Sequence, residues 1–235
     1  FILPPDSSIT YGTTRPIDLK NFDVYIINEP QNPFTSSEKQ AIFDFVRNGG
    51  GLFMVADHVS SDRNGNGWDS PKVWQDFYSD SFGIHFQQVG EGNNNYSPKC
   101  RNFTGIDSIY NGVFGTASDT FYFHAGTTIP VNSDSNVHAI AKDSGNSNFS
   151  MLTAARWYKG KVAGMGDSSP ASDGTGNPGN TLYDNWNEGS SRVLILNTTW
   201  WLSHKSTQAG ISQSFASISQ KNGLVIINVN CSTDI

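Results

Sequence analysis

Residues 49–69 read Gly-Gly-Gly-Leu-Phe-Met-Val-Ala-Asp-His-Val-Ser-Ser-Asp-Arg-Asn-Gly-Asn-Gly-Trp-Asp, which predicts a helix end, a buried strand and a polar loop in succession. The run from Leu52 to Ala56 is apolar without interruption, as is typical of a parallel strand covered on both faces. Asp57 and His58 therefore follow the carboxyl end of a strand. Because ligands bind at the carboxyl ends of strands in open α/β sheets, this edge is the first candidate for a functional site.

A strand–helix–strand unit surrounds this run. Residues 23–28 form a short apolar run that ends at Glu29-Pro30, so Glu29 also follows a strand. The segment 35–51 begins with the capping box Thr35-Ser36-Ser37-Glu38, keeps apolar residues at helical spacing and ends in glycines. A helix between two strands makes a right-handed crossover, which predicts that the two strands are parallel.

Further elements have weaker signals. We expect helices over 71–82 and 190–204, and strands over 137–141, 150–158, 161–165 and 224–229. Lys159-Gly160 joins two of these strands and predicts a hairpin. The polar segment 171–189 is too long for a simple connection, and loops of this length are usually functional or disordered.

Size and charge exclude several classes of protein. With 235 residues and no break in composition, the chain is predicted to be a single domain, with residues 1–22 and 205–235 as extensions around its core. The net charge of −6, with only 15 Lys and Arg, argues against nucleic acid or an anionic membrane as a partner. No run approaches the roughly 20 apolar residues of a membrane span. The wealth of Asn, Ser, Gly and aromatic residues resembles that of carbohydrate-handling exported proteins, so we expect a secreted or extracellular protein.

The chain contains two cysteines, Cys100 and Cys231. In an oxidising compartment they could form one disulfide, which would stabilise the fold by about 4 kcal/mol through the long loop that it closes. Two unpaired buried thiols are the equal alternative from sequence.

A family resemblance rests on motifs in two parts of the chain. The first part contains Asp23-Val-Tyr-Ile-Ile-Asn, Phe34-Thr-Ser-Ser-Glu-Lys-Gln-Ala-Ile and Phe45-Val-Arg-Asn-Gly-Gly-Gly-Leu-Phe-Met-Val-Ala-Asp-His; the second contains Gly160-Lys-Val-Ala-Gly-Met-Gly-Asp-Ser-Ser-Pro and Leu194-Ile-Leu-Asn-Thr-Thr-Trp-Trp-Leu. Together they resemble the class I glutamine amidotransferase-like superfamily, especially its ThuA-like branch. The resemblance covers half of the chain and implies an α/β, flavodoxin-like three-layer fold, with a mostly parallel sheet and helices on both faces.

The chain departs from that superfamily in two ways. Its amidotransferases carry a nucleophilic cysteine at the turn that here reads Ala56-Asp57-His58, so glutamine hydrolysis by that route is excluded. The fold also normally begins with a strand–helix unit before Asp23, which residues 1–22 do not supply. Either that unit was removed or the strand at 224–229 takes its place.

The loop after the central strand has the spacing of a cation site. Asp62, Asn64, Asn66 and Gly67 match the first half of a calcium-loop pattern, whereas its twelfth position is Val73 instead of glutamate. We expect a divalent metal ion here, most readily calcium, and the alternative is an ordinary polar turn. The predicted metal ligands are Asp57, Asp62, Asn64, Asn66, Asp69 and Asp173.

Acidic and hydroxyl side chains at strand ends suggest catalytic chemistry. Asp57 and Asp167 follow two predicted strands and could act as general acid and base or as metal ligands, although Asp167 could instead cap its turn. His58 is a candidate base or ligand. Gly166-Asp167-Ser168-Ser169 resembles the nucleophile block of GDSL-type esterases without its partner motif, which makes Ser168 an alternative nucleophile.

Four residues are predicted to contact substrate: Glu29, Trp68, His124 and Trp186. The two tryptophans lie in polar loops, where indole rings stack on sugars or simply pack. The leading prediction is therefore a secreted, metal-assisted hydrolase of a carbohydrate or related polar small molecule. The alternatives are a non-catalytic, calcium-stabilised carbohydrate-binding or accessory domain, and a serine esterase that uses Ser168.

Overall fold

The computed structural model describes residues 8–175, 183–204, 215–221 and 224–230. The contacts divide the chain into two compact units, Phe1–Lys205 and Ser206–Ile235. The second unit contains an antiparallel hairpin of β11 (Phe215–Lys221) and β12 (Leu224–Asn230). The predicted role of residues 205–235 as an extension around the core remains a prediction.

The first unit contains one large sheet with the strand order β1-β2-β10-β9-β8-β3-β6, and β7 pairs with β9. Its strands are β1 (Val24–Asn28), β2 (Gly51–Val55), β3 (Lys99–Phe103), β6 (Phe121–Tyr122), β7 (Ile129–Pro130), β8 (Val137–Asp143), β9 (Phe149–Trp157) and β10 (Gly160–Met165). A small separate hairpin joins β4 (Asn111–Gly112) to β5 (Gly115–Thr116).

The α/β class is confirmed, but the prediction of a mostly parallel sheet is wrong. Only β1, β2 and β10 are parallel neighbours, and all the other described pairs of this sheet are antiparallel. The physical reason is connection length: β8, β9 and β10 follow one another through short turns, and a parallel pair needs a crossover of a dozen or more residues. The predicted hairpin between β9 and β10 is confirmed.

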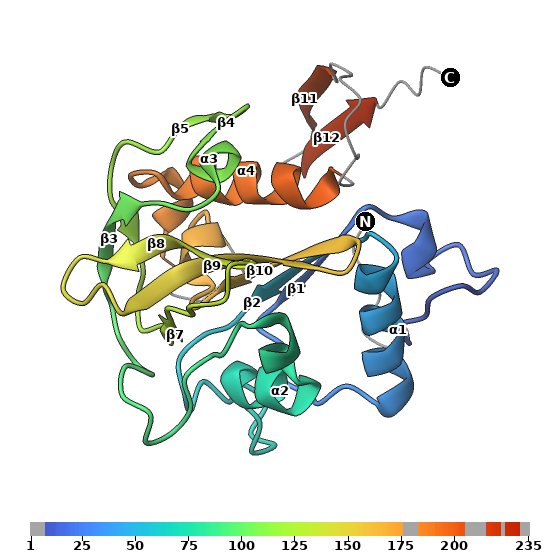
Figure 1. Ribbon diagram of the computed structural model, residues 1–235, viewed down its shortest axis with the longest axis horizontal. Coiled ribbons are helices and arrows are strands. Elements are labelled where there is room, and N and C mark those ends of the chain that lie inside the picture. Colours follow the sequence, from blue (N-terminus) through green and yellow to red (C-terminus); the bar gives the residue numbers. More distant parts are fainter. Residues whose placement is uncertain (1–7, 176–182, 205–214, 222–223, 231–235) are drawn as a thin grey trace. The chain divides into compact units, whose positions relative to one another are not determined.

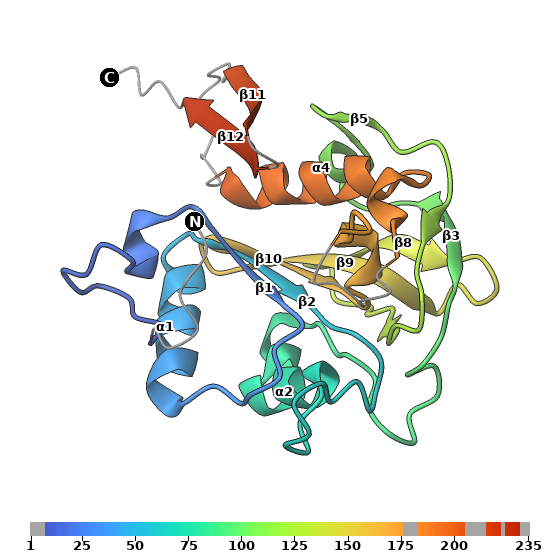
Figure 2. The ribbon, with the colours of Figure 1, turned by 180° about the vertical axis from the view of Figure 1, so that it is seen from behind.

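Helices cover both faces of this sheet (Figures 1 and 2). One face carries α1 (Ser36–Arg47) and α2 (Ser70–Phe77), and the other carries α4 (Ser191–Ser203) and the short α3 (Asp107–Tyr110). The four 3₁₀ turns are η1 (Leu19–Asn21), η2 (Ser79–Phe82), η3 (Ser169–Ala171) and η4 (Asn185–Asn187). None of the described helices is long and apolar enough to cross a membrane.

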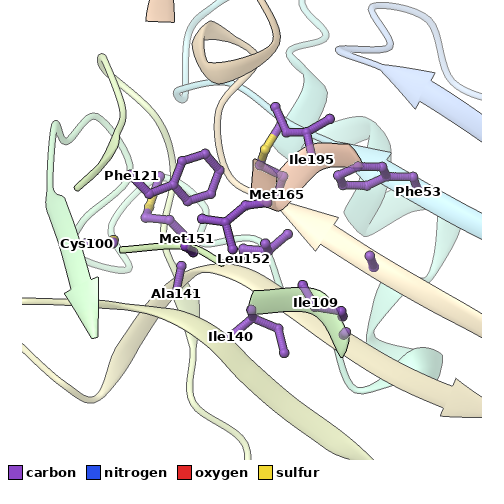
Figure 3. Packing of buried hydrophobic residues seen from close by; sticks show 14 of the residues in the cluster. Phe53, Cys100, Ile109, Phe121, Ile140, Ala141, Met151, Leu152, Met165 and Ile195 are labelled. Carbon is purple, nitrogen blue, oxygen red and sulfur yellow. The ribbon is translucent and has the colours of Figure 1, made fainter. Parts of the chain in front are cut away.

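The strand β2 is buried along its whole length because its side chains alternate between two cores. Leu52 and Met54 pack with α1 and α2, whereas Phe53 and Val55 pack with the α4 side. Figure 3 shows the second core, in which Phe53 shares the cluster with Met165 of β10. Burial of a side chain of this size contributes about 2 kcal/mol, which fixes β2 at the centre of the fold.

The predicted helices are present, with different ends. The capping box of α1 forms as expected: Thr35 accepts from the Glu38 backbone and Glu38 accepts from the Thr35 backbone. This helix ends at Arg47, four residues before the predicted end. The helix predicted over 71–82 breaks at Tyr78, which adopts a left-handed conformation with φ 69° between α2 and η2.

The described residues before β1 form no strand–helix unit, in line with their sequence. Instead, the buried carboxylate of Asp18 accepts hydrogen bonds from Thr10, Gly12, Thr13 and Lys20. Burial opposes the charge of Asp18, but the bonds from Thr13, Lys20 and Thr10 hold its pKa well below the usual range. This network orders the entry into the sheet.

Cys100 lies on β3 and is fully buried in the core on the α4 side (Figure 3). Its pKa is raised, mainly by burial. Cys231 lies outside the described residues, so the disulfide remains a prediction.

Candidate active site

Three parallel strands end together at one edge of the sheet. Asn28 of β1 pairs with Val55 of β2, which pairs with Met165 of β10, and the Ala56 amide donates to the Met165 carbonyl at 2.8 Å. The strands β2 and β10, which precede Asp57 and Asp167, run side by side in the same direction. Glu29, Asp57 and Asp167 therefore follow neighbouring strand ends.

Two of these carboxylates share the same partners. Ser61 Oγ lies 2.9 Å from Glu29 Oε1 and 3.0 Å from Asp57 Oδ2. Arg63 donates from Nε to Glu29 Oε1 and from Nη2 to Asp57 Oδ2, the second contact at 2.6 Å. The guanidinium thus bridges two acidic groups that would otherwise repel each other.

Ser168 joins this network from the third strand end. Its Oγ donates to Glu29 Oε2 at 3.2 Å. The strand-end cluster, as we call it, consists of Glu29, Asp57, Ser61, Arg63, Asp167 and Ser168. Its residues come from segments more than a hundred positions apart in the sequence, and the parallel strands are what brings them together.

The charged groups of the cluster shift one another's pKa values. Burial raises the pKa of Glu29, the Arg63 hydrogen bond opposes this, and the negative charge of Asp57 adds to the rise. The hydrogen bond with Glu29 raises the pKa of Arg63, so this residue keeps its positive charge. Because the Glu29 side chain is 11% exposed and the Asp57 side chain 6%, Glu29 is the slightly more accessible of the two carboxylates.

Asp167 is the most deeply buried acid of the cluster. Burial raises its pKa to about 7, and the nearby charge of Asp57 acts in the same direction. Its carboxylate accepts from the His124 backbone and from both the backbone and the hydroxyl of Ser169. Asp167 therefore holds the turn after β10, as the structural alternative predicted, and also lies within electrostatic reach of Asp57.

His58 follows Asp57 directly and is half-buried. Its Nδ1 lies 2.7 Å from the Val59 carbonyl, which can only accept a hydrogen bond, so Nδ1 carries the proton. In the neutral ring this leaves Nε2 with a free lone pair, the form that a base or a metal ligand needs.

The loop predicted to bind calcium uses its oxygens locally. Asp62 accepts from the amides of Asn66 and Gly67, and Asn66 accepts from the amide of Trp68. Asn64 accepts from the Asn66 amide at 3.1 Å. These contacts are those of a polar turn.

Asp69 has a clear structural role. Its two carboxylate oxygens accept from the Lys72 and Ser60 amides, which makes Asp69 the N-cap of α2. Asp173 lies in an exposed loop, where hydrogen bonds from the hydroxyl and the amide of Thr175 lower its pKa.

The remaining predicted substrate contacts have partners of their own. The Lys72 ammonium lies 4.7 Å from the ring centroid of Trp68. Trp186 packs against the core on the α4 side. The exposed ring of His124 stacks on Tyr183 with 3.7 Å between ring centroids. None of these three rings forms a hydrogen bond or ion pair with the cluster carboxylates in the described part of the chain, whereas Glu29 lies inside the cluster.

No group of three or more His, Cys, Asp or Glu side chains within the described ranges is arranged to hold a metal ion. The calcium site remains a prediction, and thermal unfolding with calcium or EDTA tests it. A calcium concentration of 100 Kd would stabilise the fold by about 2.7 kcal/mol and raise Tm. We expect this rise to disappear in Asp62→Asn. Equal Tm values with calcium and with EDTA would count against the site.

Sequence reasoning missed Ser61 and Arg63. Both belong to the stretch 49–69, but the spacing of oxygen ligands around Arg63 favoured a bound metal cation. The positive charge at this site comes instead from the guanidinium of Arg63 itself. The available signal was a lone arginine between Asp62 and Asn64, in a segment that otherwise carries acids and amides. A buried acidic pair needs a counter-charge, and this arginine is the one that supplies it.

No protein-family profile and no curated protein matches the sequence. Among solved structures, the N-terminal domain of mmIFT52 matches 81% of this chain and 81% of its own length with a TM-score of 0.55 at 16% identity. The cytoplasmic protein STM1381 from Salmonella typhimurium LT2 matches 80% of this chain and 76% of its own, with a TM-score of 0.50 at 14% identity. A protein described as ThuA-like, from Parabacteroides merdae, has a TM-score of 0.48 at 11% identity, covering 82% and 75% of the two chains. The first two similarities extend to the fold alone.

Proposed function

We propose that this chain is a hydrolase of a polar substrate, with carbohydrates as the favoured class, and that the strand-end cluster is its active site. The observation that supports this most is the meeting of Glu29, Asp57 and Asp167 at the ends of three parallel strands. Ligands of α/β sheets bind at this edge, and buried carboxylates with raised pKa values are typical acid–base groups.

The environments of the acids suggest separate roles. Glu29 has a raised pKa and partial access to solvent, so it exchanges a proton with the substrate or with the attacking water. Asp57 stays paired with Arg63 and provides fixed negative charge opposite the positive charge that develops on a sugar in the transition state. Asp167 positions the turn that carries Ser168.

The serine esterase is the second candidate, and one contact favours it. The Ser168 hydroxyl donates to Glu29, which is the arrangement of a nucleophile with a base. Against it, Ser168 forms no hydrogen bond with any histidine of the described residues. In the carboxylate mechanism, the same hydroxyl simply orients Glu29.

A substrate screen tests the proposal and separates these candidates. The purified chain is assayed on nitrophenyl glycosides and nitrophenyl esters, with and without EDTA, and after treatment with an organophosphate. We expect glycoside hydrolysis that survives the organophosphate. Ester hydrolysis that is lost on labelling of Ser168 would instead support the esterase, and inactivity on all substrates would support the non-catalytic domain.

We also infer membership of the ThuA-like branch, from the motifs at 23–58 and 160–170 together with their placement here. These motifs form β1, α1, β2 and β10, the parallel part of the sheet and its first crossover. The flavodoxin-like character is thus proposed for the parallel part, to which β9, β8, β3 and β6 add an antiparallel extension.

A further inference from the structure

Two adjoining hollows lie apart from the strand-end cluster. Their volumes are about 380 Å³ and about 440 Å³, and they share Asp80, Gly83 and Asn132 in their walls. Together they have the size of a small-molecule site. No residue of the strand-end cluster lines either of them.

One wall of the larger hollow is aromatic, and its packing against other aromatic residues holds it in place. Trp157 ends β9 and packs on Phe43 and Phe82, with ring centroids 5.5 Å and 5.0 Å away. Tyr158 follows it with its ring centroid 4.6 Å from that of Trp157, and it remains 73% exposed. The position of Trp157 is therefore fixed by the core, and Tyr158 extends this wall into solvent.

The larger hollow is also lined by short polar side chains. Asn132 accepts from the Asp134 amide at 2.9 Å, and Asp134 accepts from the Asn136 amide at 2.8 Å through Oδ1. These turns fix the planes of the side chains before any ligand arrives. Asp134 Oδ2 and the amide oxygen of Asn136 accept no hydrogen bond from the described residues, so both are available to a donor.

The charges of the hollow select among ligand classes. The carboxylate of Asp134 disfavours phosphates and acidic sugars in the larger hollow, whereas that of Asp80 is paired with His85 of the smaller hollow, whose Nδ1 lies 3.0 Å from Asp80 Oδ1. Arg156 also lines the larger hollow, but its guanidinium lies 5.7 Å from the ring of Trp201 and is thus directed to the α4 side of the sheet, whereas Trp157 packs on the opposite face. A cationic ligand is disfavoured too, because at the aromatic wall it would meet the positive charge of Arg47, whose guanidinium lies 5.8 Å from the Trp157 ring and 5.2 Å from the Tyr158 ring.

We propose that this groove, formed by Asp80, Asn132, Asp134, Asn136, Trp157 and Tyr158, is a second binding site, for a neutral saccharide. The apolar face of a sugar ring packs on the aromatic wall, and its hydroxyls donate to the carboxylate and amide oxygens of the groove. The saccharide class rests on the proposed function. The groove would hold a polymeric substrate away from the site of cleavage.

Calorimetric titration of the Asp57→Asn protein tests the groove without turnover. The probes are cellohexaose, xylohexaose, mannohexaose and laminarihexaose, with hexagalacturonic acid as the anionic comparison. We expect at least one neutral probe to bind, and both Tyr158→Ala and Asn136→Ala in the same background to weaken its binding at least tenfold. Tyr78→Ala is the matched control, because Tyr78 is also exposed with a positive φ but does not line the groove.

Three results would overturn the proposal that the groove binds a neutral saccharide. These are that no neutral probe binds, that the Tyr158→Ala protein binds the probe as tightly as the control does, or that the acidic probe binds most tightly. Since the Tyr158 ring is mostly exposed, the variant is expected to fold, and an unchanged Tm verifies this. Hydrolysis by the otherwise unaltered chain is measured separately. Saccharide binding without hydrolysis would contradict the proposed hydrolase activity but not the saccharide site. Hydrolysis of short glycosides without Tyr158-dependent binding would contradict only the saccharide site.

Discussion

Asp57→Asn is expected to lower the rate of glycoside hydrolysis by at least a factor of about 100 while leaving the fold intact. The amide keeps the shape of the side chain but removes the charge opposite Arg63 and Glu29. The Arg63 side chain is 59% exposed, so water can solvate the guanidinium once it loses this partner. Initial rates at saturating substrate, together with Tm, are the measurements.

The matched control for this experiment is Asp107→Asn, which makes the same chemical change at an exposed position in α3. It is expected to retain full activity. Glu29→Gln should lose as much activity as Asp57→Asn, because the two carboxylates work with the same arginine. Unchanged turnover in Asp57→Asn would show that the strand-end cluster is not the active site.

Gly166→Ala is expected to destabilise the first unit by about 3 kcal/mol, at the upper end of the cost of overpacking. A Cβ at this position would lie 1.9 Å from the carbonyl oxygen of Thr127. The two segments cannot move apart easily, because the Thr127 amide donates to the Gly166 carbonyl at 2.8 Å and the Gly166 amide donates to Met151 at 3.0 Å. Thermal unfolding should show a fall in Tm of roughly 6–12 °C.

Gly145→Ala is the control for this substitution, since its added methyl would meet its nearest atoms at 3.6 Å, an ordinary contact. It should shift Tm little. An equal Tm for Gly166→Ala and this control would contradict the close approach of the 124–128 segment to the end of β10. It would also contradict the placement of Asp167, which accepts from the backbone of this segment.

Those parts of the fold with local signals could be predicted from sequence. The apolar run at Leu52–Ala56 and the capping box at Thr35 gave β2 and α1, because burial and capping depend on neighbours in the chain. In the antiparallel extension, β8, β9 and the hairpin from β9 to β10 had sequence signals too, but β3 and β6 did not. Strand β3 (Lys99–Phe103) is partly exposed and irregularly paired, so it shows neither an apolar run nor a clean alternation.

The same distinction applies to the candidate site: only residues with a local sequence signal could be predicted. Asp57 and Asp167 could be predicted because each follows a recognisable strand. Arg63 could not, because its role depends on Glu29, which lies 34 positions away. Asp69 was predicted as a metal ligand although Asp69-Ser70-Pro71 is a helix-start pattern, with an N-cap followed by proline in the first turn. The oxygen-rich spacing of the loop outweighed that simpler signal.

The position of β10 between β2 and β9 has a consequence for how the protein is made. During synthesis the ribosome completes β1, β2, β8 and β9 before it reaches the strand that joins them. Until then the nascent chain contains the pair β1–β2 and the pair β8–β9 without the strand that lies between them, so apolar strand edges are exposed. The pairing of β10 with β2 is long-range in sequence, and such pairing is slow to form. Chains released before residue 165 should therefore be substrates for chaperones and proteases, and the last strand of the sheet to be translated is the one that completes the acidic site.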